Sequence, residues 1–262
     1  MNVINVIFNE IKKAHKVTFH SPMMYFSLLI WPIASLYTTL YSYSSFDYSK
    51  TFSDRVSLKL FLLVGAMGYL CFWSFIQSAW QMSDERRTGT LETIFLSPVN
   101  RIAMIYGRAL GSFIESCWMF MLYMCFMFYV YNDGMKFEVK KIVIAFIVLI
   151  VSSMLWGGFI NVLFLFSRDA VALFSVLDGP MELFSGARMP VGTMPSWGKV
   201  IATIFPLTHS LVFLRACLLG EKMDIKTITA LLITWFIMFA LTSVFLKIGE
   251  GVNQEKGTYN IY

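Results

Sequence analysis

Long apolar stretches without a single charge alternate with short polar segments along this chain of 262 residues. A helix needs about 20 apolar residues to cross the hydrocarbon core of a bilayer, and several of these stretches reach that length. The pattern therefore predicts an all-α integral membrane protein with six transmembrane helices. The predicted spans are residues 21–46, 60–82, a third beginning near Ile105, 142–167, 170–187 and 228–246.

The first 20 residues have a different, amphipathic pattern. Apolar residues recur at helical spacing, namely Ile4, Ile7, Phe8, Ile11 and Ala14. Basic residues cluster in the second half of the segment, namely Lys12, Lys13, His15 and Lys16. A basic amphipathic helix is typical of the membrane interface. We expect residues 1–20 to form an interfacial helix, with a solvated tail as the alternative, and residues 21–262 to form the transmembrane domain.

Proline and glycine mark special positions inside the spans. Pro22 suits the first turn of a helix, whereas Pro32 predicts a kink whose freed carbonyl must be bonded by a neighbour. Gly107 and Gly111 form a Gly-x-x-x-Gly pair, which lets another helix approach closely. That helix can belong to the same chain or to a second copy.

Three acidic residues fall inside predicted spans, where a charge is costly and normally faces protein or water. Glu115, in the third span, is either half of a structural pair, for example with Arg108, or a participant in coupling or substrate passage. Asp178 and Glu182 are four residues apart and so share one helical face. A Gly-Pro pair between them predicts a broken fifth helix, buried in protein or lined by water.

The segment from residue 188 to 220 is too interrupted to span a membrane. Pro190, Pro195 and Pro206 divide it into half-length apolar pieces. Two short helices that enter and leave on the same side would satisfy this pattern. His209 and Arg215 lie on the second piece, and Arg215 either meets Asp178 or Glu182 or extends to the lipid headgroups.

Residues 83–101 form the only long polar run in the first half of the chain. Gly89 is suited to end the helix that arrives from the membrane, and Thr90 to cap a short new helix with Glu92 in its first turn. Pro98 would end that helix. Its apolar residues share one face and would form an exposed docking surface; they are Leu91, Ile94 and Phe95. The alternative is an ordinary loop at the membrane surface.

Composition agrees with a membrane protein and excludes several other classes. Hydrophobic residues make up 57% of the chain and charged residues 14%, against about 25% charged in soluble domains. The net charge of +5 is spread out, which argues against nucleic-acid binding. The four cysteines lie in apolar surroundings without a Cys-x-x-Cys pair, so neither a metal site nor a disulfide framework is expected. No cleavable signal peptide is expected either.

The distribution of basic residues does not determine the orientation. With both termini and residues 83–101 placed inside, ten of the 21 Lys and Arg residues lie inside and the other eleven outside. The inner ten are Lys12, Lys13, Lys16, Arg86, Arg87, Arg101, Arg108, Arg168, Lys247 and Lys256.

Two sequence blocks carry a family resemblance. The first is Glu-Arg-Arg-x-Gly-Thr-Leu-Glu-x-Ile-x-x-Ser-Pro-Val-x-Arg, residues 85–101, and the second combines Phe-Ser-Gly-x-x-x-Pro-x-x-x-x-Pro, residues 184–195, with Pro-Leu-Thr-x-x-x-x-x-Leu-Arg, residues 206–215. In this order they resemble ABC-2-type export permeases, the membrane subunits of one class of ATP-binding-cassette exporter. Together with the spans, the resemblance covers nearly the whole chain.

The resemblance implies how residues 83–101 would work. This segment would be a cytoplasmic coupling helix between spans 2 and 3, with Gly89 as hinge and polar contacts from Glu85, Arg86, Arg87 and Glu92 around the docking face. The segment 188–220 would be re-entrant on the outer side before helix 6. Both termini would be cytoplasmic in a bacterial plasma membrane.

The chain has no Gly-x-x-x-x-Gly-Lys-[Ser/Thr] motif, so it has no phosphate-binding loop of its own. The resemblance implies two copies of a separate ATPase, which would bind the ATP and Mg²⁺, and a second permease chain. The expected function is outward transport of an amphipathic or hydrophobic substrate, such as a drug, peptide or lipid. Export of a lipid-linked polysaccharide is the alternative within the family.

Two other classes of function remain as alternatives. An ion-coupled carrier could use Glu115, Asp178 and Glu182, although such carriers commonly show paired broken helices and only one is predicted here. A membrane enzyme is disfavoured, because the histidines and cysteines form no recognisable site.

Overall fold

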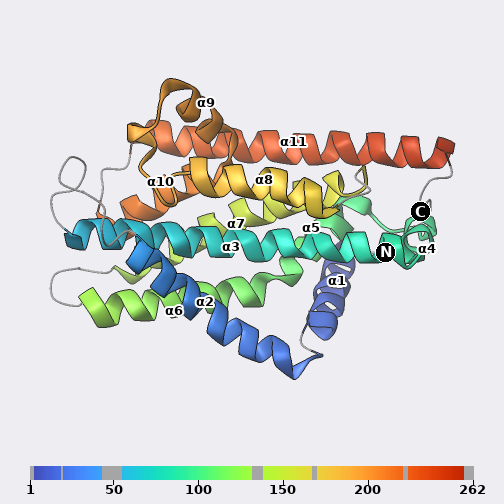
Figure 1. Cartoon of the computed structure of the whole chain (residues 1–262). Helices are drawn as coiled ribbons and strands as arrows, with labels where there is room; N and C mark the ends of the chain where they lie inside the picture. The colour runs from blue at the N-terminus through green and yellow to red at the C-terminus, as the bar shows by residue number, and fades with distance from the viewer. Residues whose placement is uncertain are drawn as a thin grey trace.

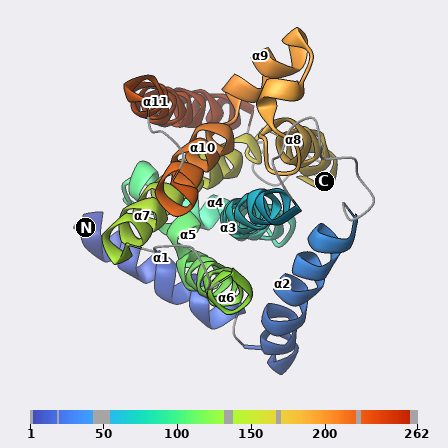
Figure 2. The same cartoon turned by 90° about the vertical axis from the view of Figure 1, so that its left-hand side faces the viewer.

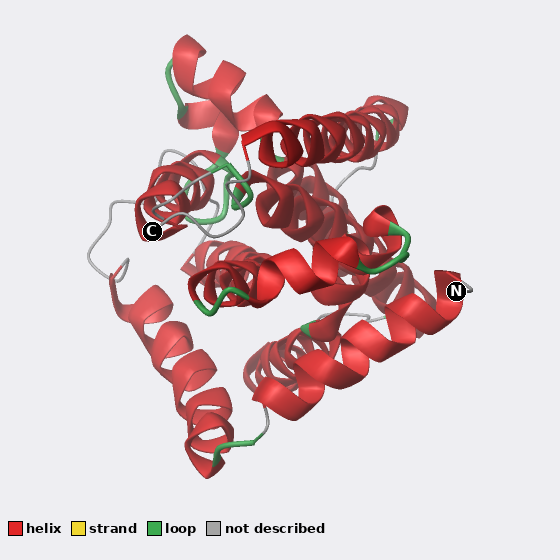
Figure 3. Cartoon of the chain, turned by 90° about the vertical axis from the view of Figure 1, so that its right-hand side faces the viewer, coloured by secondary structure: helices red, strands yellow, loops and turns green. Residues whose placement is uncertain are grey.

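The computed structural model describes residues 3–18, 20–42, 55–131, 138–166, 170–220 and 224–256. These residues fold entirely into helices and connecting turns, with no strand among them (Figure 3). The helices are α1 (Val3–Thr18), α2 (Pro22–Ser42), α3 (Arg55–Arg87), α4 (Thr90–Leu96), α5 (Arg101–Gly111), α6 (Phe113–Tyr131), α7 (Val139–Leu163), α8 (Ala170–Phe184), the 3₁₀ turn η1 (Val191–Thr193), α9 (Ser196–Ile204), α10 (Pro206–Leu219) and α11 (Ile225–Lys256).

Five helical segments are long and apolar enough to cross a membrane. They are α2, α3, the consecutive pair α5 and α6, α7 and α11. The bent pair α9 and α10 makes a sixth if it is counted as one span. The chain is therefore a multi-pass, all-helical membrane protein, as the apolar pattern predicts.

Helix α3 is the centre of the bundle. Of its most apolar 18-residue window, 78% is buried, compared with 11% for α2 and 22% for α11. It packs against α2, α6, α7 and α10, which surround it in Figure 2. Glycine allows the closest of these approaches: a Cβ atom on Gly157 of α7 would lie 2.8 Å from the backbone oxygen of Phe75. The outer helices α2 and α11 leave most of their apolar surface free for lipid or another chain.

Pro32 lies inside α2, and its environment shows how a membrane helix tolerates it. Proline cannot donate a backbone hydrogen bond to the carbonyl four residues earlier, which belongs to Leu28. That oxygen instead accepts a 2.9 Å hydrogen bond from the indole nitrogen of Trp118 on α6. The prediction that a neighbour satisfies the freed carbonyl is confirmed.

Helix α1 packs along α5, and the Gly-x-x-x-Gly pair lies in that contact. A Cβ atom on Gly107 would lie 3.0 Å from the Cα of Ile7, and one on Gly111 would lie 2.4 Å from the Cβ of Ala14. The pair thus serves packing within the chain. Ile4 and Phe8, which belong to the same predicted apolar set as Ile7 and Ala14, are exposed.

The predicted fifth span differs from expectation in two ways. Helix α8 has 15 residues, about 22 Å, and is too short to be counted among the spanning candidates. It also continues through the Gly179-Pro180 pair, so the predicted break between Asp178 and Glu182 is wrong. Pro180 removes one backbone donor, but the helical path on both sides survives because membrane helices can absorb such a loss.

The proline-rich segment after α8 forms two short helices. Helices α9 and α10 meet at Phe205 with an angle of 91°, and Pro206 occupies the first turn of α10. Both lie at the end of the bundle opposite α4 (Figure 1). The predicted pair of half-length helices is present; its re-entrant role stays a prediction.

Figure 1 shows α1, α4 and the last turns of α11 near one end of the bundle. We call this the α4 end, and the end that carries α9 and α10 the α9 end. The residues between the predicted fourth and fifth spans, 168–169, and most of those between the first two spans, 47–59, lie outside the described residues.

Candidate functional site

The corner between α3 and α4 is built from local backbone bonds. Gly89 has a φ of 73°, the left-handed conformation that glycine adopts without strain, and it ends the incoming helix as predicted. The hydroxyl of Thr88 donates to the carbonyl of Asp84 at 2.9 Å, and that of Thr90 to the carbonyl of Glu85 at 3.3 Å. The predicted capping of α4 by Thr90 is therefore wrong: its hydroxyl satisfies the end of α3 instead.

Helix α4 turns its apolar face inward. Leu91 is 2% exposed and Phe95 8% exposed, and both belong to the main hydrophobic core, against which Ile94 also packs. The prediction that Leu91, Ile94 and Phe95 form an exposed docking face is corrected, because α3 covers that face in the folded chain. The periodicity identified the apolar face but not what covers it.

The exposed surface of α4 is on its other side. Leu96 is 79% exposed, and Thr93 and Pro98 are exposed beside it. Pro98 follows the helix, which ends at Leu96, in agreement with its predicted role as terminator. The side chain of Glu92, a predicted polar contact, lies outside the described residues.

Arg101, at the start of α5, holds the end of α4. Its guanidinium donates to the carbonyls of Ile94 at 3.3 Å, Ser97 at 2.9 Å and Phe95. It also donates to Glu250 of α11 at 3.1 Å and lies over the Phe95 ring, 5.1 Å from its centroid. The last carbonyls of a helix lack the amide donors that a further helical turn would supply, so they are free to accept from a side chain such as Arg101. Sequence reasoning assigned this residue no role, although it is the last residue of the first motif.

Glu85 lies in a buried charge network rather than on a docking surface. Its Oε2 forms an ion pair with Nη2 of Arg108 at 2.7 Å, and its Oε1 accepts a hydrogen bond from Lys13. Arg108 also donates to Glu10 at 3.3 Å. Arg108 is fully buried. Two cations and two anions therefore balance where α1, α3 and α5 meet. Arg86 and Arg87, also predicted to be polar contacts, lie outside this charge network. Arg86 donates to the carbonyl of Leu165 at 3.4 Å, and Arg87 is exposed.

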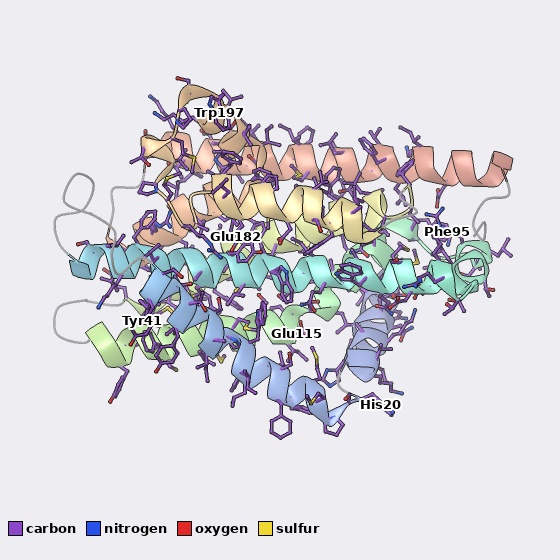
Figure 4. All side chains as sticks on the ribbon, viewed as in Figure 1. His20, Tyr41, Phe95, Glu115, Glu182 and Trp197 are labelled. Atoms are coloured by element: carbon purple, nitrogen blue, oxygen red, sulfur yellow. The ribbon has the colours of Figure 1, made fainter. Side chains whose placement is uncertain are left out.

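Glu115 is separate from that network. Its predicted partner Arg108 bonds the two other acids, and within the described residues the Glu115 carboxyl has no hydrogen-bond or ion-pair partner. The Glu115 side chain, labelled in Figure 4, is buried. It borders a cavity of about 500 Å³ between α1, α3, α4 and the α5–α6 segment. Gln77 and Gln81 of α3 also line this cavity.

The two acids of α8 face α3. The Tyr69 hydroxyl donates to Asp178 at 2.9 Å, and Glu182 forms an ion pair with Arg188. The guanidinium of Arg215 instead donates to the carbonyls of Gly186 at 2.8 Å and Phe61 at 3.2 Å and lies over the Phe61 ring.

Arg215 is 5% exposed, so the predicted alternative in which it extends to the lipid headgroups is wrong. The hydrogen bonds of its guanidinium to Gly186 and Phe61 go to backbone carbonyls. Arg215 joins α10 to α3 and to the segment that follows α8. His209, also on α10, contacts the carbonyl of Thr203 at 3.2 Å through its Nε2.

The family model described as "ABC-2 family transporter protein" matches residues 10–247, more than nine tenths of the chain. The chain belongs to the ABC-2 transporter family. No curated protein matches it. As an ABC-2 protein it is the membrane subunit of an ABC transporter, and such a permease works with an ABC ATPase and a membrane partner. The match covers the α3–α4 corner, the buried charge network and both acids of α8.

Proposed function

We propose that this ABC-2 chain is the permease subunit of an exporter for an amphipathic or hydrophobic substrate such as a drug, peptide or lipid. A separate cytoplasmic ATPase, in two copies, would bind ATP and Mg²⁺ and supply the energy. A second permease chain would complete the path. The α4 end would face the cytoplasm of a bacterial cell, which places both termini there.

The observation that carries the proposal is the attachment of α4 to three other helices. Thr90 bonds the end of α3, and Arg101 joins the end of α4 to the start of α5 and to Glu250 of α11. An ATPase that moves α4 would therefore move α3 and α5 with it. Because α3 is the most buried of the five candidate spanning helices, its displacement would reach the packed core.

Arg215 provides the corresponding connection toward the α9 end. It bonds the carbonyl of Phe61 near the beginning of α3 and that of Gly186 after α8. A shift of α3 would be transmitted to α10 through this guanidinium. On this basis we place the substrate path or gate among six residues along α6, α8 and α10, namely Glu115, Asp178, Glu182, Pro206, His209 and Arg215.

The exposed residues of α4 would form the contact with the ATPase. Leu96 is an apolar residue on a short helix, of the kind that anchors a helix in a groove of its partner. Thr93 and Pro98 would lie at the rim of that contact. The buried residues Leu91 and Phe95 would hold α4 in place.

The test is co-purification of the permease with its ATPase after the substitution Leu96→Asp. We expect the ATPase to be lost while the permease remains folded, because the change places a charge in an apolar contact and removes nothing from the core. The matched control is Val139→Asp, which alters a comparably exposed apolar residue (73%) at the first position of α7. Retention of the ATPase by the Leu96→Asp variant would contradict the proposed docking surface. Failure of the unchanged chain to bind any ATPase would favour the ion-coupled carrier.

A further inference from the structure

A second cavity, of about 390 Å³, lies between α2, α3 and α8. It is nearer the α9 end than the α4 end, and Glu182 lies where α8 faces α3 (Figure 4). The cavity combines aromatic, acidic and apolar walls. Its aromatic and charged lining residues are Trp31, Tyr69, Trp73, Asp178, Glu182 and Arg188.

The aromatic wall comes from a pair of tryptophans. Trp31 of α2 and Trp73 of α3 stack with ring centroids 5.5 Å apart and planes 19° from parallel. Trp31 is 49% exposed. Indole rings have an electron-rich face, which attracts organic cations more strongly than any other side-chain ring does.

The acidic wall is only partly neutralised. Asp178 and Glu182 share one face of α8, and Arg188 pairs with Glu182, so the lining carries two carboxylates and one guanidinium. One oxygen of Asp178 accepts the Tyr69 hydroxyl. The other oxygen, Oδ1, is buried and has no hydrogen-bond partner among the described residues. A buried acceptor without a partner is costly, and a cation in the cavity would remove that cost.

The remaining walls suit an amphipathic molecule. Leu62, Ala66 and Leu70 of α3 contribute apolar surface, and α2 contributes the hydroxyls of Ser35 and Thr38. Only 11% of the apolar window of α2 is buried, so this side of the cavity is bounded by the least enclosed of the spanning helices. A hydrophobic body could lie along α2 and α3 with its charged group near Asp178.

We infer that this cavity binds an amphipathic organic cation, with its positive group held by Asp178 and the stacked tryptophans. The inference rests on the proposed function, since it names the substrate class of the exporter. A neutral hydroxyl or amide could donate to Oδ1 of Asp178 but would leave the excess carboxylate charge unbalanced, and an anion would add a negative charge beside two carboxylates. A sugar could stack on the tryptophans, but its binding would not require the carboxylate charge.

The experiment measures equilibrium binding to the permease–ATPase complex in lipid nanodiscs without ATP. The probes are tetraphenylphosphonium and tetraphenylborate, which have nearly the same size and shape and opposite charge. Binding to empty nanodiscs is subtracted. We expect saturable binding of the phosphonium and none of the borate. Asp178→Asn, which keeps the shape of the side chain and removes its charge, should weaken phosphonium binding at least about tenfold, because it removes one partner of a desolvated charge contact.

Two further variants test the binding site even if the Asp178→Asn variant fails to fold. Trp31→Leu changes a half-exposed residue and should weaken phosphonium binding several-fold without affecting the fold. Glu138→Gln is the matched control, because it neutralises an exposed carboxylate outside the cavity and should leave binding unchanged.

Equal saturable binding of both probes would overturn the inference. Unchanged phosphonium binding by both the Asp178→Asn and the Trp31→Leu variants would also overturn it. A loss of binding caused by Trp31→Leu but not by Asp178→Asn would do the same, because it would indicate aromatic stacking without a role for the carboxylate charge. The amount of ATPase retained in the same preparation separates this outcome from failure of the proposed function. A complex that holds its ATPase but binds no phosphonium rejects the substrate class and leaves the exporter intact.

Discussion

At the scale of single residues, Gly65 determines how close α3 lies to the segment after α8. A Cβ atom there would lie 1.9 Å from the backbone oxygen of Ala187, a distance that no backbone tolerates without moving. Gly65→Ala should therefore lower the free energy of unfolding by about 1–3 kcal/mol, the usual cost of overpacking a core. Chemical denaturation of the two proteins in detergent measures this difference in the free energy of unfolding.

The matched control for this substitution is Gly251→Ala in α11. Nothing lies within 4 Å of a Cβ atom at this position, and the backbone is already helical. Alanine should stabilise the helix there by about 0.5–1 kcal/mol, since glycine is the less favourable residue inside a helix. If the two alanine variants changed stability equally, close packing would not be the cause at Gly65.

Arg108 is the residue whose surroundings sequence reasoning predicted least well. It is fully buried between Glu10 and Glu85, so its removal would leave two carboxylates in low-dielectric surroundings with only Lys13 to balance them. Arg108→Met should lower the free energy of unfolding by about 3 kcal/mol or more.

Lys141→Met provides the comparison for the buried network. Lys141 pairs with Glu138 at 2.8 Å, but both side chains are more than half exposed. Exposed ion pairs contribute about 1 kcal/mol or less, so this variant should unfold almost like the unchanged protein in the same denaturant series. An equally small effect of Arg108→Met would mean that the buried network is not needed to hold α1 against the bundle.

At the scale of elements, α4 depends on its neighbours for its existence. Seven residues are too few for a stable isolated helix. Arg101 satisfies its last carbonyls, and α3 covers its apolar face. Arg101→Ala should therefore speed amide hydrogen exchange in residues 91–97 by at least about tenfold. Arg87→Ala, an exposed arginine at the end of α3, is the control and should leave exchange there unchanged.

The same elements show where prediction from sequence stops. The position of α4 followed from Gly89 before it and Pro98 after it, because both residues act on the backbone locally. The direction of its apolar face did not follow, because a helical stripe of Leu91, Ile94 and Phe95 looks the same whether a partner or the same chain covers it. In α8 the Gly-Pro pair predicted a break, yet the packed helix continues.

At the scale of the whole molecule, the two ends of the bundle have different constructions. The α4 end is tied together by charges and carbonyl contacts of Arg101, Arg108 and Glu85. The α9 end is built from short helices that meet at 91°, and it is joined to α3 through Arg215. In the proposed mechanism, movement imposed at the α4 end would travel along α3 to the α9 end without passing through the exposed outer helices.

The sequence by itself determined that the chain is a helical membrane protein and where five of its six predicted long apolar segments lie. Uncharged runs of spanning length leave no other stable arrangement in lipid, since every backbone group must be bonded within its own segment. The two motif blocks pointed to the ABC-2 family, which the family match over residues 10–247 then showed.

Only the tertiary structure decided which polar residues meet. Glu85 and Arg108 are 23 positions apart, and Tyr69 and Asp178 are 109 positions apart. Charge and spacing show that such side chains need partners, because an unpaired charge is costly in an apolar setting. They do not show which partner each obtains, since that depends on how the helices pack and how each is rotated about its axis. For the same reason the cavity beside Trp31 and Asp178 exists only in the folded chain.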